Sequence, residues 1–281
     1  MPPPITRVQL RLGLDCILKM RYAREGLAQK ESAAEAALQS AGRAMVTEHY
    51  WSCFPPDIDG RRMSGDRVIG KAVRRAKDEG QPIRIRDVAL RVDGILVRIG
   101  ELTVRPDRWE VAEIFGKRMP ADPEELWSRR GAIRVAWRPY LADLAVSRAL
   151  TERWLAEHSA SVESAARIQV SATMVGLRED VSEGPTRVID EFRLSENGID
   201  GAVQVDTRRG SREEGDRCFA RVPLDRGETD RFFTRSPLIA RTHGTEIVEG
   251  RPFPSDLEVG VPEAIDELRC VAATRQWPAP E

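Results

Sequence analysis

Residues 83–115 read IRIRDVALRVDGILVRIGELTVRPDRWEVAEIF, and this stretch decides the fold. Its first part alternates apolar and polar residues at the two-residue period of a strand, with a slip near Asp87. Asp93-Gly94 is a strong signal for a two-residue hairpin, because both turn positions need a positive φ. Residues 105–108 form a second turn, and residues 109–115 form a third strand. The stretch therefore predicts an antiparallel meander of three strands.

Helical patterns flank this meander in the sequence. The first 50 residues carry apolar side chains at helical spacing, and the second helix of this part extends over about residues 31–50. A short basic helix is expected over residues 66–77 and a long amphipathic one over residues 140–158. Helices around an antiparallel sheet define an α+β fold. We expect this α+β core to occupy residues 1–160.

The periodic pattern weakens after residue 161. We expect a looser, β-containing C-terminal part over residues 161–281, and the sequence does not indicate its role. Its expected strands are at residues 168–175, 188–192 and 203–207.

Composition narrows the class of protein. The 281 residues carry 44 basic and 45 acidic side chains, so the net charge of −1 excludes a histone-like polycation. The longest stretch without Asp, Glu, Lys or Arg is ten residues, too short for a transmembrane helix. The N-terminus lacks the apolar core of a secretory signal, so we expect an intracellular, cytoplasmic protein without a membrane partner. The four cysteines include no closely spaced pair, so no metal–cysteine site is expected.

Two segments of the meander and one helix carry a family resemblance. They are DGILVRIGEL (residues 93–102), WEVAEIF (109–115) and DLAVSRA (143–149), preceded by a cysteine-containing helix near Cys16 and a Phe-Pro segment at Phe54. Their order and spacing resemble the PD-(D/E)XK nuclease superfamily, in its RecB-like, Cas4-like branch. The resemblance implies a restriction-endonuclease-like core. It also implies an Asp on the middle strand and a Glu on the next that bind Mg²⁺, a Lys two residues later, and a Gln on the helix.

Three of these four functional positions are altered. Gly100 stands at the Asp position, Phe115 at the Lys position and Ser147 at the Gln position, so only Glu113 is retained. We therefore expect a nuclease-related protein that is catalytically inactive and retains a nucleic-acid-binding or protein-interaction role. No cofactor is expected in that case.

An active Mg²⁺-dependent DNA nuclease with relocated ligands is the alternative. A bulge at Gly100 would turn Glu101 toward Glu113, so that these two carboxylates bind Mg²⁺. Lys117 has the same strand parity as Phe115 and would act as the catalytic amine beside Glu113.

Basic residues concentrate before and within the meander. Residues 61–91 contain ten Arg or Lys against four Asp or Glu, whereas residues 244–269 contain two against seven. A phosphate backbone of DNA or RNA would suit the basic stretch. The predicted nucleic-acid-binding residues are Arg74, Arg75, Arg84 and Arg86. A third hypothesis is an interaction module that binds an unknown protein partner and has no nucleic-acid role.

Overall fold

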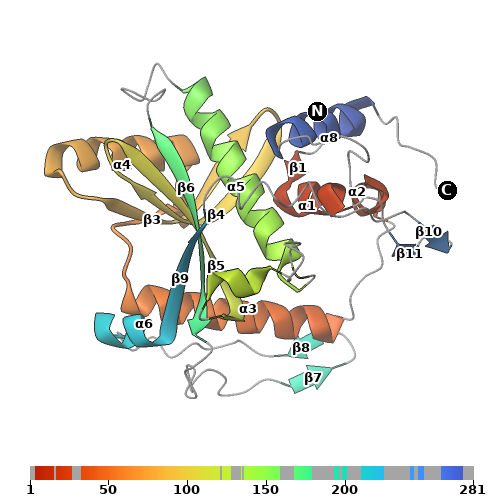
Figure 1. Cartoon of the computed structure of the whole chain (residues 1–281), viewed down its shortest axis with the longest axis horizontal. Coiled ribbons are helices and arrows are strands. Elements are labelled where there is room, and N and C mark those ends of the chain that lie inside the picture. Colours follow the sequence, from red (N-terminus) through yellow and green to blue (C-terminus); the bar gives the residue numbers. More distant parts are fainter. Residues whose placement is uncertain are drawn as a thin grey trace.

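The structure is a computed structural model of the chain, and Figure 1 shows its course. It describes residues 4–15, 17–26, 33–120, 122–127, 134, 136–158, 168–178, 193–195, 198–200, 210–224, 241–243, 246–249 and 261–274. The expected strands at residues 188–192 and 203–207 lie outside these ranges. The statements below concern the described residues.

A seven-stranded mixed sheet forms the centre of the molecule, with strand order β2-β3-β4-β5-β6-β9 and β1 paired to β4. The strands are β1 (Ile5–Thr6), β2 (Ile58–Asp59), β3 (Ile83–Val92), β4 (Ile95–Val104), β5 (Arg108–Met119), β6 (Gln169–Arg178) and β9 (Phe219–Leu224). Strands β3, β4 and β5 form the predicted antiparallel meander. Strand β6 then runs parallel to β5, and β9 runs antiparallel to β6.

The β3–β4 hairpin turns where the sequence predicts it. Asp93 and Gly94 adopt φ values of 50° and 78°, as a two-residue turn of this kind requires. The predicted slip at Asp87 is confirmed by its φ of 60°. Before this residue the buried apolar side chains of β3 are Ile83 and Ile85, and after it they are Val88, Leu90 and Val92. The positive φ of Asp87 interrupts the regular alternation of side chains along β3. These apolar residues, before Asp87 and after it, are therefore all buried, although their numbers change from odd to even.

Helices occupy most of the remaining described chain. They are α1 (Arg7–Asp15), α2 (Ile17–Glu25), α3 (Ala33–Cys53), α4 (Gly65–Glu79), α5 (Arg138–Glu157), α6 (Arg212–Cys218) and α8 (Val261–Thr274), with 3₁₀ turns η1 (Gly60–Arg62) and η2 (Pro123–Leu126). Helix α4 ends at Gly80, whose φ of 63° and N–H bond to the Ala76 carbonyl form a left-handed C-cap. Two short hairpins complete the described elements: β7 (Arg193–Ser195) with β8 (Gly198–Asp200), and β10 (Arg241–His243) with β11 (Glu246–Glu249).

The sheet separates two apolar cores, one on each face. The larger core joins the sheet to α1, α4, α5 and α8, with Leu10, Ile69, Leu144 and Ile265 among its buried residues. The smaller core lies under α3, where Val46, Tyr50 and Trp51 meet Ala112 and Ile114 of β5. Figure 1 shows α5 and α3 on different sides of the sheet, with α6 beside α3. The predicted mixture of helices around an antiparallel meander is confirmed.

The sheet crosses the domain boundary expected near residue 160. Strands β6 and β9 come from the C-terminal part, yet β6 pairs with β5 over most of its length and β9 extends the same sheet. Helix α8 contributes Ile265 and Leu268 to the larger core. If the chain were divided at residue 160, the edge of β5 and part of the larger core would be exposed. Residues before and after this point therefore contribute strands to the same sheet. No helix among the described residues combines the length and apolar character needed to cross a membrane.

Candidate functional site

Glu113 lies fully buried in the middle of β5, on the face of the sheet that α5 covers. Ser147 of α5 donates a hydrogen bond from its hydroxyl to Glu113 Oε1, with an O–O distance of 3.0 Å. The guanidinium of Arg7, at the start of α1, donates to the same carboxylate oxygen and to the Ser147 hydroxyl, the latter at 3.1 Å. Three segments that are distant in the sequence therefore meet at Glu113.

A second buried carboxylate, Asp143 of α5, belongs to the same cluster. Arg11 Nη1 donates to Asp143 Oδ2 at 3.0 Å, and Arg7 Nε lies 3.8 Å from Asp143 Oδ1. Arg7 therefore bridges two carboxylates with one guanidinium. Among the described residues, neither Glu113 Oε2 nor Asp143 Oδ1 has a hydrogen-bond partner. Arg43 Nη2 of α3 lies 4.0 Å from Glu113 Oε2.

Burial controls the electrostatics of this cluster. Loss of water raises the pKa of Glu113, the nearby Asp143 carboxylate raises it further, and Arg7, Arg43 and Ser147 oppose the shift only in part. Burial by itself would lower the pKa of Arg7, but Glu113 and Asp143 together raise it. The Arg7 guanidinium therefore stays positively charged, and Glu113 is the group of the cluster whose protonation changes with pH.

The altered positions of the nuclease motif surround Glu113. A Cβ atom built on Gly100 would lie 3.5 Å from Glu113 Oε2, so a side chain at this position would point at the carboxylate. Phe115 shares the face of Glu113 and packs edge-on against Tyr140 of α5, with ring centroids 4.8 Å apart. Ser147 donates directly to the carboxylate, as described above. The four positions that the sequence motif selects, Gly100, Glu113, Phe115 and Ser147, are therefore brought together.

Lys117 does not join them. Its ammonium donates to the Ala136 carbonyl at 2.8 Å and lies 4.0 Å from the centre of the Trp137 ring, at the start of α5. Neither contact involves Glu113. The pairing of β5 with β6 shifts register between Ile114 and Arg118, so simple strand parity does not place the end of this side chain. Burial lowers the pKa of Lys117.

Glu101 lies on the opposite face of the sheet. It pairs across the strands with Ala112, which belongs to the core under α3. Its carboxylate accepts hydrogen bonds from Tyr50 Oη at 2.6 Å, Arg84 Nη2 at 3.0 Å and Arg221 Nη1 at 3.3 Å. Burial would raise the pKa of Glu101, but Arg221 and Arg84 outweigh burial and lower it.

The predicted metal pair of Glu101 and Glu113 is therefore wrong. Successive residues of a strand point to opposite faces, so Glu113, which follows Ala112, points away from Glu101. Gly100 does not turn Glu101 toward Glu113. Instead, the Tyr50 hydroxyl and two guanidinium groups hold the Glu101 carboxylate against α3.

The four predicted nucleic-acid-binding arginines have different surroundings. Arg74 is exposed on α4, and Arg75 pairs with Glu79 at 2.9 Å on the same helix. Arg84 is held by Glu101, and Arg86 is only 9% exposed and pairs with Glu48 of α3. Arg84 and Arg86 therefore lie on the α3 face of the sheet, opposite Glu113, and each is paired with a carboxylate.

Sequence reasoning did not connect several of these residues with the two buried glutamates. Arg7 lies 106 residues from Glu113, and Arg221 lies 120 residues from Glu101, so no local pattern connects either pair. Asp143 belongs to the helix segment that carries the family resemblance. Apart from its carboxyl group, nothing in the sequence indicates that Asp143 lies beside Glu113.

No family model, no curated protein and no solved structure matches the chain. The fold defines the class of protein: a mixed sheet between two layers of helices, with a buried arginine–carboxylate cluster on one face.

Proposed function

We propose that this protein is a nuclease-related, catalytically inactive protein of the PD-(D/E)XK type that retains nucleic-acid binding. One observation carries the proposal: the Arg7 guanidinium binds Glu113, the retained one of the two metal-binding positions, and supplies a positive charge beside the carboxylate that would hold the divalent cation in a nuclease of this type. The positive charge of the side chain takes over the neutralising role of the metal but supplies no activated water.

The order of the elements supports the relationship. Helix α4 is followed by the β3–β4–β5 meander, then by α5, and then by β6 in parallel with β5. The motif positions Gly100, Glu113, Phe115 and Ser147 meet at one place on this scaffold. These four positions belong to three elements, β4, β5 and α5. If the motifs matched only by chance, there would be no reason to expect all four positions close together.

The surroundings of Glu113 explain why catalysis is not expected. Mg²⁺ requires several oxygen ligands in near-octahedral geometry, and the side chain missing at Gly100 removes one of the two strand carboxylates. Phe115 offers an apolar ring where the reaction needs an amine that stabilises developing negative charge. The alternative of an active nuclease with relocated ligands would need Glu101, which faces α3 and is already bound by two arginines.

The exposed face of α4 is the part of the predicted basic stretch best placed to bind a phosphate backbone. Arg67, Lys71 and Arg74 are exposed and follow one another at intervals of four and three residues, so they share one side of the helix. Strands β3 and β4 and the larger core lie against the opposite side, where Val68, Ile69 and Ala72 are buried. This three-residue face, called the α4 basic face below, replaces Arg84 and Arg86 in the proposal.

Reconstruction of the metal site tests the inactive-nuclease assignment. The parent protein should show no Mg²⁺- or Mn²⁺-dependent cleavage of single- or double-stranded DNA. The double variant Gly100→Asp with Arg7→Ala restores a second carboxylate and removes the blocking cation, so it should bind Mn²⁺, as measured by calorimetry or electron paramagnetic resonance. Adding Glu113→Ala should abolish this binding.

Two results would contradict the assignment. The first is cleavage by the parent protein that Glu113→Ala abolishes, which would favour an active enzyme. The second is a double variant that keeps the parent's circular dichroism spectrum yet binds no Mn²⁺, which would mean that Gly100 and Glu113 do not mark a former metal site.

Binding to labelled single-stranded DNA and RNA at low salt tests the nucleic-acid role. Replacing Arg67, Lys71 and Arg74 by Ala should weaken binding and reduce the slope of log K against log salt by about 2 units, since each phosphate contact contributes about 0.7 on single strands. A control with the same loss of charge replaces the exposed residues Arg98, Arg108 and Arg217. Equal effects in both triple variants would contradict the α4 basic face, and absence of binding by the parent would favour the interaction module.

A further inference from the structure

Two helices outside the Glu113 site face each other with metal-binding side chains. His49 and Cys53 lie four residues apart on α3, and Glu214 and Cys218 lie four residues apart on α6. Residues at this spacing share one face of a helix. Helices α3 and α6 are adjacent in Figure 1, and both contribute to the region around the smaller core.

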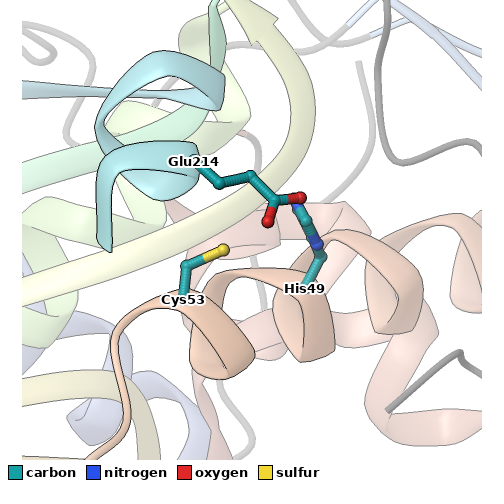
Figure 2. Close-up of side chains that lie close together, drawn as sticks. All are labelled: His49, Cys53 and Glu214. Carbon is teal, nitrogen blue, oxygen red and sulfur yellow. The ribbon is translucent and has the colours of Figure 1, made fainter. Parts of the chain in front are cut away.

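The ligand atoms of three of these residues form a compact cluster. Figure 2 shows Glu214 extending from α6 toward the His49 ring, with the Cys53 sulfur pointing into the space between the two helices. The nitrogen, sulfur and oxygen atoms of His49, Cys53 and Glu214 lie within 4.8 Å of one another. His49 Nε2 and Glu214 Oε1 are 3.7 Å apart.

This cluster has an unexplained polar atom at its centre. His49 Nε2 is buried, and it has no hydrogen-bond partner among the described residues. A buried polar group without a partner is costly, and a bound ion is one of the ways in which a folded protein satisfies such an atom. Burial also lowers the pKa of His49, although Glu214 opposes the shift. The ring is therefore neutral at neutral pH, which is the form that binds metal ions.

Glycines allow α6 to approach α3 closely at this point. A Cβ atom on Gly210 would lie 2.4 Å from Cys53 Sγ, and one on Gly215 would lie 2.5 Å from the Phe54 ring and 2.8 Å from Cys53 Cβ. Either side chain would force the helices apart. The N-cap residue Ser211 accepts a hydrogen bond from the Glu214 N–H at 3.1 Å and fixes the first turn of α6. The close approach of the two backbones thus brings Glu214 to His49 and Cys53.

We propose that His49, Cys53 and Glu214 bind a zinc ion that joins α6 to α3, with Cys218 as the fourth ligand. Tetrahedral zinc with nitrogen, oxygen and sulfur ligands places neighbouring ligand atoms about 3.4–3.8 Å apart, as follows from the usual bond lengths. The 3.7 Å between His49 Nε2 and Glu214 Oε1 is already close to that range. The mixed nitrogen, oxygen and sulfur set favours zinc over Mg²⁺ or Ca²⁺, which take oxygen ligands.

The sequence contains this signal in a form that is easy to overlook. Zinc sites are usually recognised by closely spaced cysteines, and this chain has none. The pairs HxxxC and ExxxC place two ligands on one helical face just as well. Only the contact between α3 and α6 shows that the two pairs belong together.

Titration of the full chain, freed of metal by a chelator, tests the proposal. Zn²⁺ should bind with one ion per chain and raise the melting temperature, because a ligand that binds only the folded state stabilises it. Co²⁺ should give the intense near-ultraviolet absorption of a cobalt–thiolate bond, which reports a sulfur ligand in the parent protein without any substitution. Absence of both Zn²⁺ uptake and this absorption band would overturn the proposal.

Substitutions identify the ligands. His49→Gln, Cys53→Ser and Glu214→Gln should each lower Zn²⁺ affinity by more than about 100-fold, since even the partners of metal ligands contribute 10- to 100-fold. Glu214→Gln keeps the shape of a side chain that is 44% exposed, so it tests the site without opening the core. The matched controls Glu213→Gln, His158→Gln and Cys270→Ser should leave the affinity unchanged.

Two outcomes would overturn this ligand set. Equal losses in a ligand variant and its matched control would show that zinc binds elsewhere on the chain. An unchanged cobalt–thiolate band in Cys218→Ser would remove Cys218 as the fourth ligand, because loss of one of two sulfur ligands should reduce the band by about half.

Discussion

Two glutamates are fully buried in the same sheet, Glu101 on β4 and Glu113 on β5, yet their surroundings are opposite in character. Glu101 is outnumbered by its partners: Arg84, Arg221 and the Tyr50 hydroxyl all donate to it. Glu113 instead shares Arg7 with a second carboxylate, Asp143, and one of its oxygens has no hydrogen-bond partner among the residues that the structure describes.

The two carboxylates therefore differ in how fully their charge is compensated. A buried charge is tolerated when cations and hydrogen bonds compensate it fully, as around Glu101. Around Glu113 the compensation is less complete, because Arg7 is shared with Asp143 and Glu113 Oε2 accepts no hydrogen bond from the described residues. We therefore expect Glu101 to contribute more than Glu113 to the stability of the fold.

The largest expected effect is on stability and comes from Glu101→Gln. It leaves Arg84 and Arg221 partly buried beside a neutral amide, and breaking a buried ion pair in this way costs about 3 kcal/mol. Urea denaturation of the parent and the variant measures the loss. The control Glu110→Gln removes a more exposed partner of Arg221 and should cost less than about 1 kcal/mol. Equal losses in the two variants would mean that burial of Glu101 does not determine the outcome.

Glu113→Gln should cost only about 1 kcal/mol, the size of one hydrogen bond. The amide oxygen still accepts from Ser147, and Arg7 keeps Asp143 as its anionic partner. The same denaturation experiment compares the two buried positions directly. A loss of unfolding free energy as large as that of Glu101→Gln would mean that both buried glutamates stabilise the fold to the same extent.

The two glutamates should also give the unfolding free energy opposite dependences on pH. The pKa of Glu101 is lowered from 4.5, so its stabilisation is complete above pH 4.5 and is lost as pH falls through the folded-state pKa. The pKa of Glu113 is raised from 4.5, so its contribution is complete below pH 4.5 and is lost as pH rises through the folded-state pKa.

Measuring unfolding free energies of the parent and both Gln variants from acid to neutral pH tests these signs. The unfolding free energy of Glu113→Gln should increase relative to that of the parent as pH rises above 4.5. The loss of unfolding free energy caused by Glu101→Gln should become smaller as pH falls below 4.5. Parallel curves for the two variants would contradict the assignment.

The smallest effect is expected for Gly100→Ala. The nearest atom to an added Cβ is the Ala112 carbonyl oxygen at 3.4 Å, an ordinary contact, so the unfolding free energy should change by no more than about 0.5–1 kcal/mol. Gly65→Ala is the contrasting control, because its Cβ would lie 2.1 Å from the Ala89 carbonyl oxygen. A large loss in Gly100→Ala would show that no side chain fits beside Glu113, which would weaken the assignment of a former metal site.

The sequence by itself determined the elements whose signals are local. The Asp93-Gly94 turn, the slip at Asp87 and the end of α4 at Gly80 follow from backbone preferences of a few neighbouring residues. The long helix α5 and the three strands of the meander follow from apolar periodicity. These features need no knowledge of the rest of the chain, which is why they could be predicted.

Only the tertiary structure decided which side chains meet. Strand parity is relative, so the sequence did not show that Glu101 faces α3 while Glu113 faces α5. Arg7 reaches Glu113 across 106 residues, and Arg221 reaches Glu101 across 120. The same holds for the contact between α3 and α6 that gathers His49, Cys53 and Glu214. Buried charges are neutralised by whichever segment packs nearby, and packing is a property of the whole fold rather than of any one stretch of sequence.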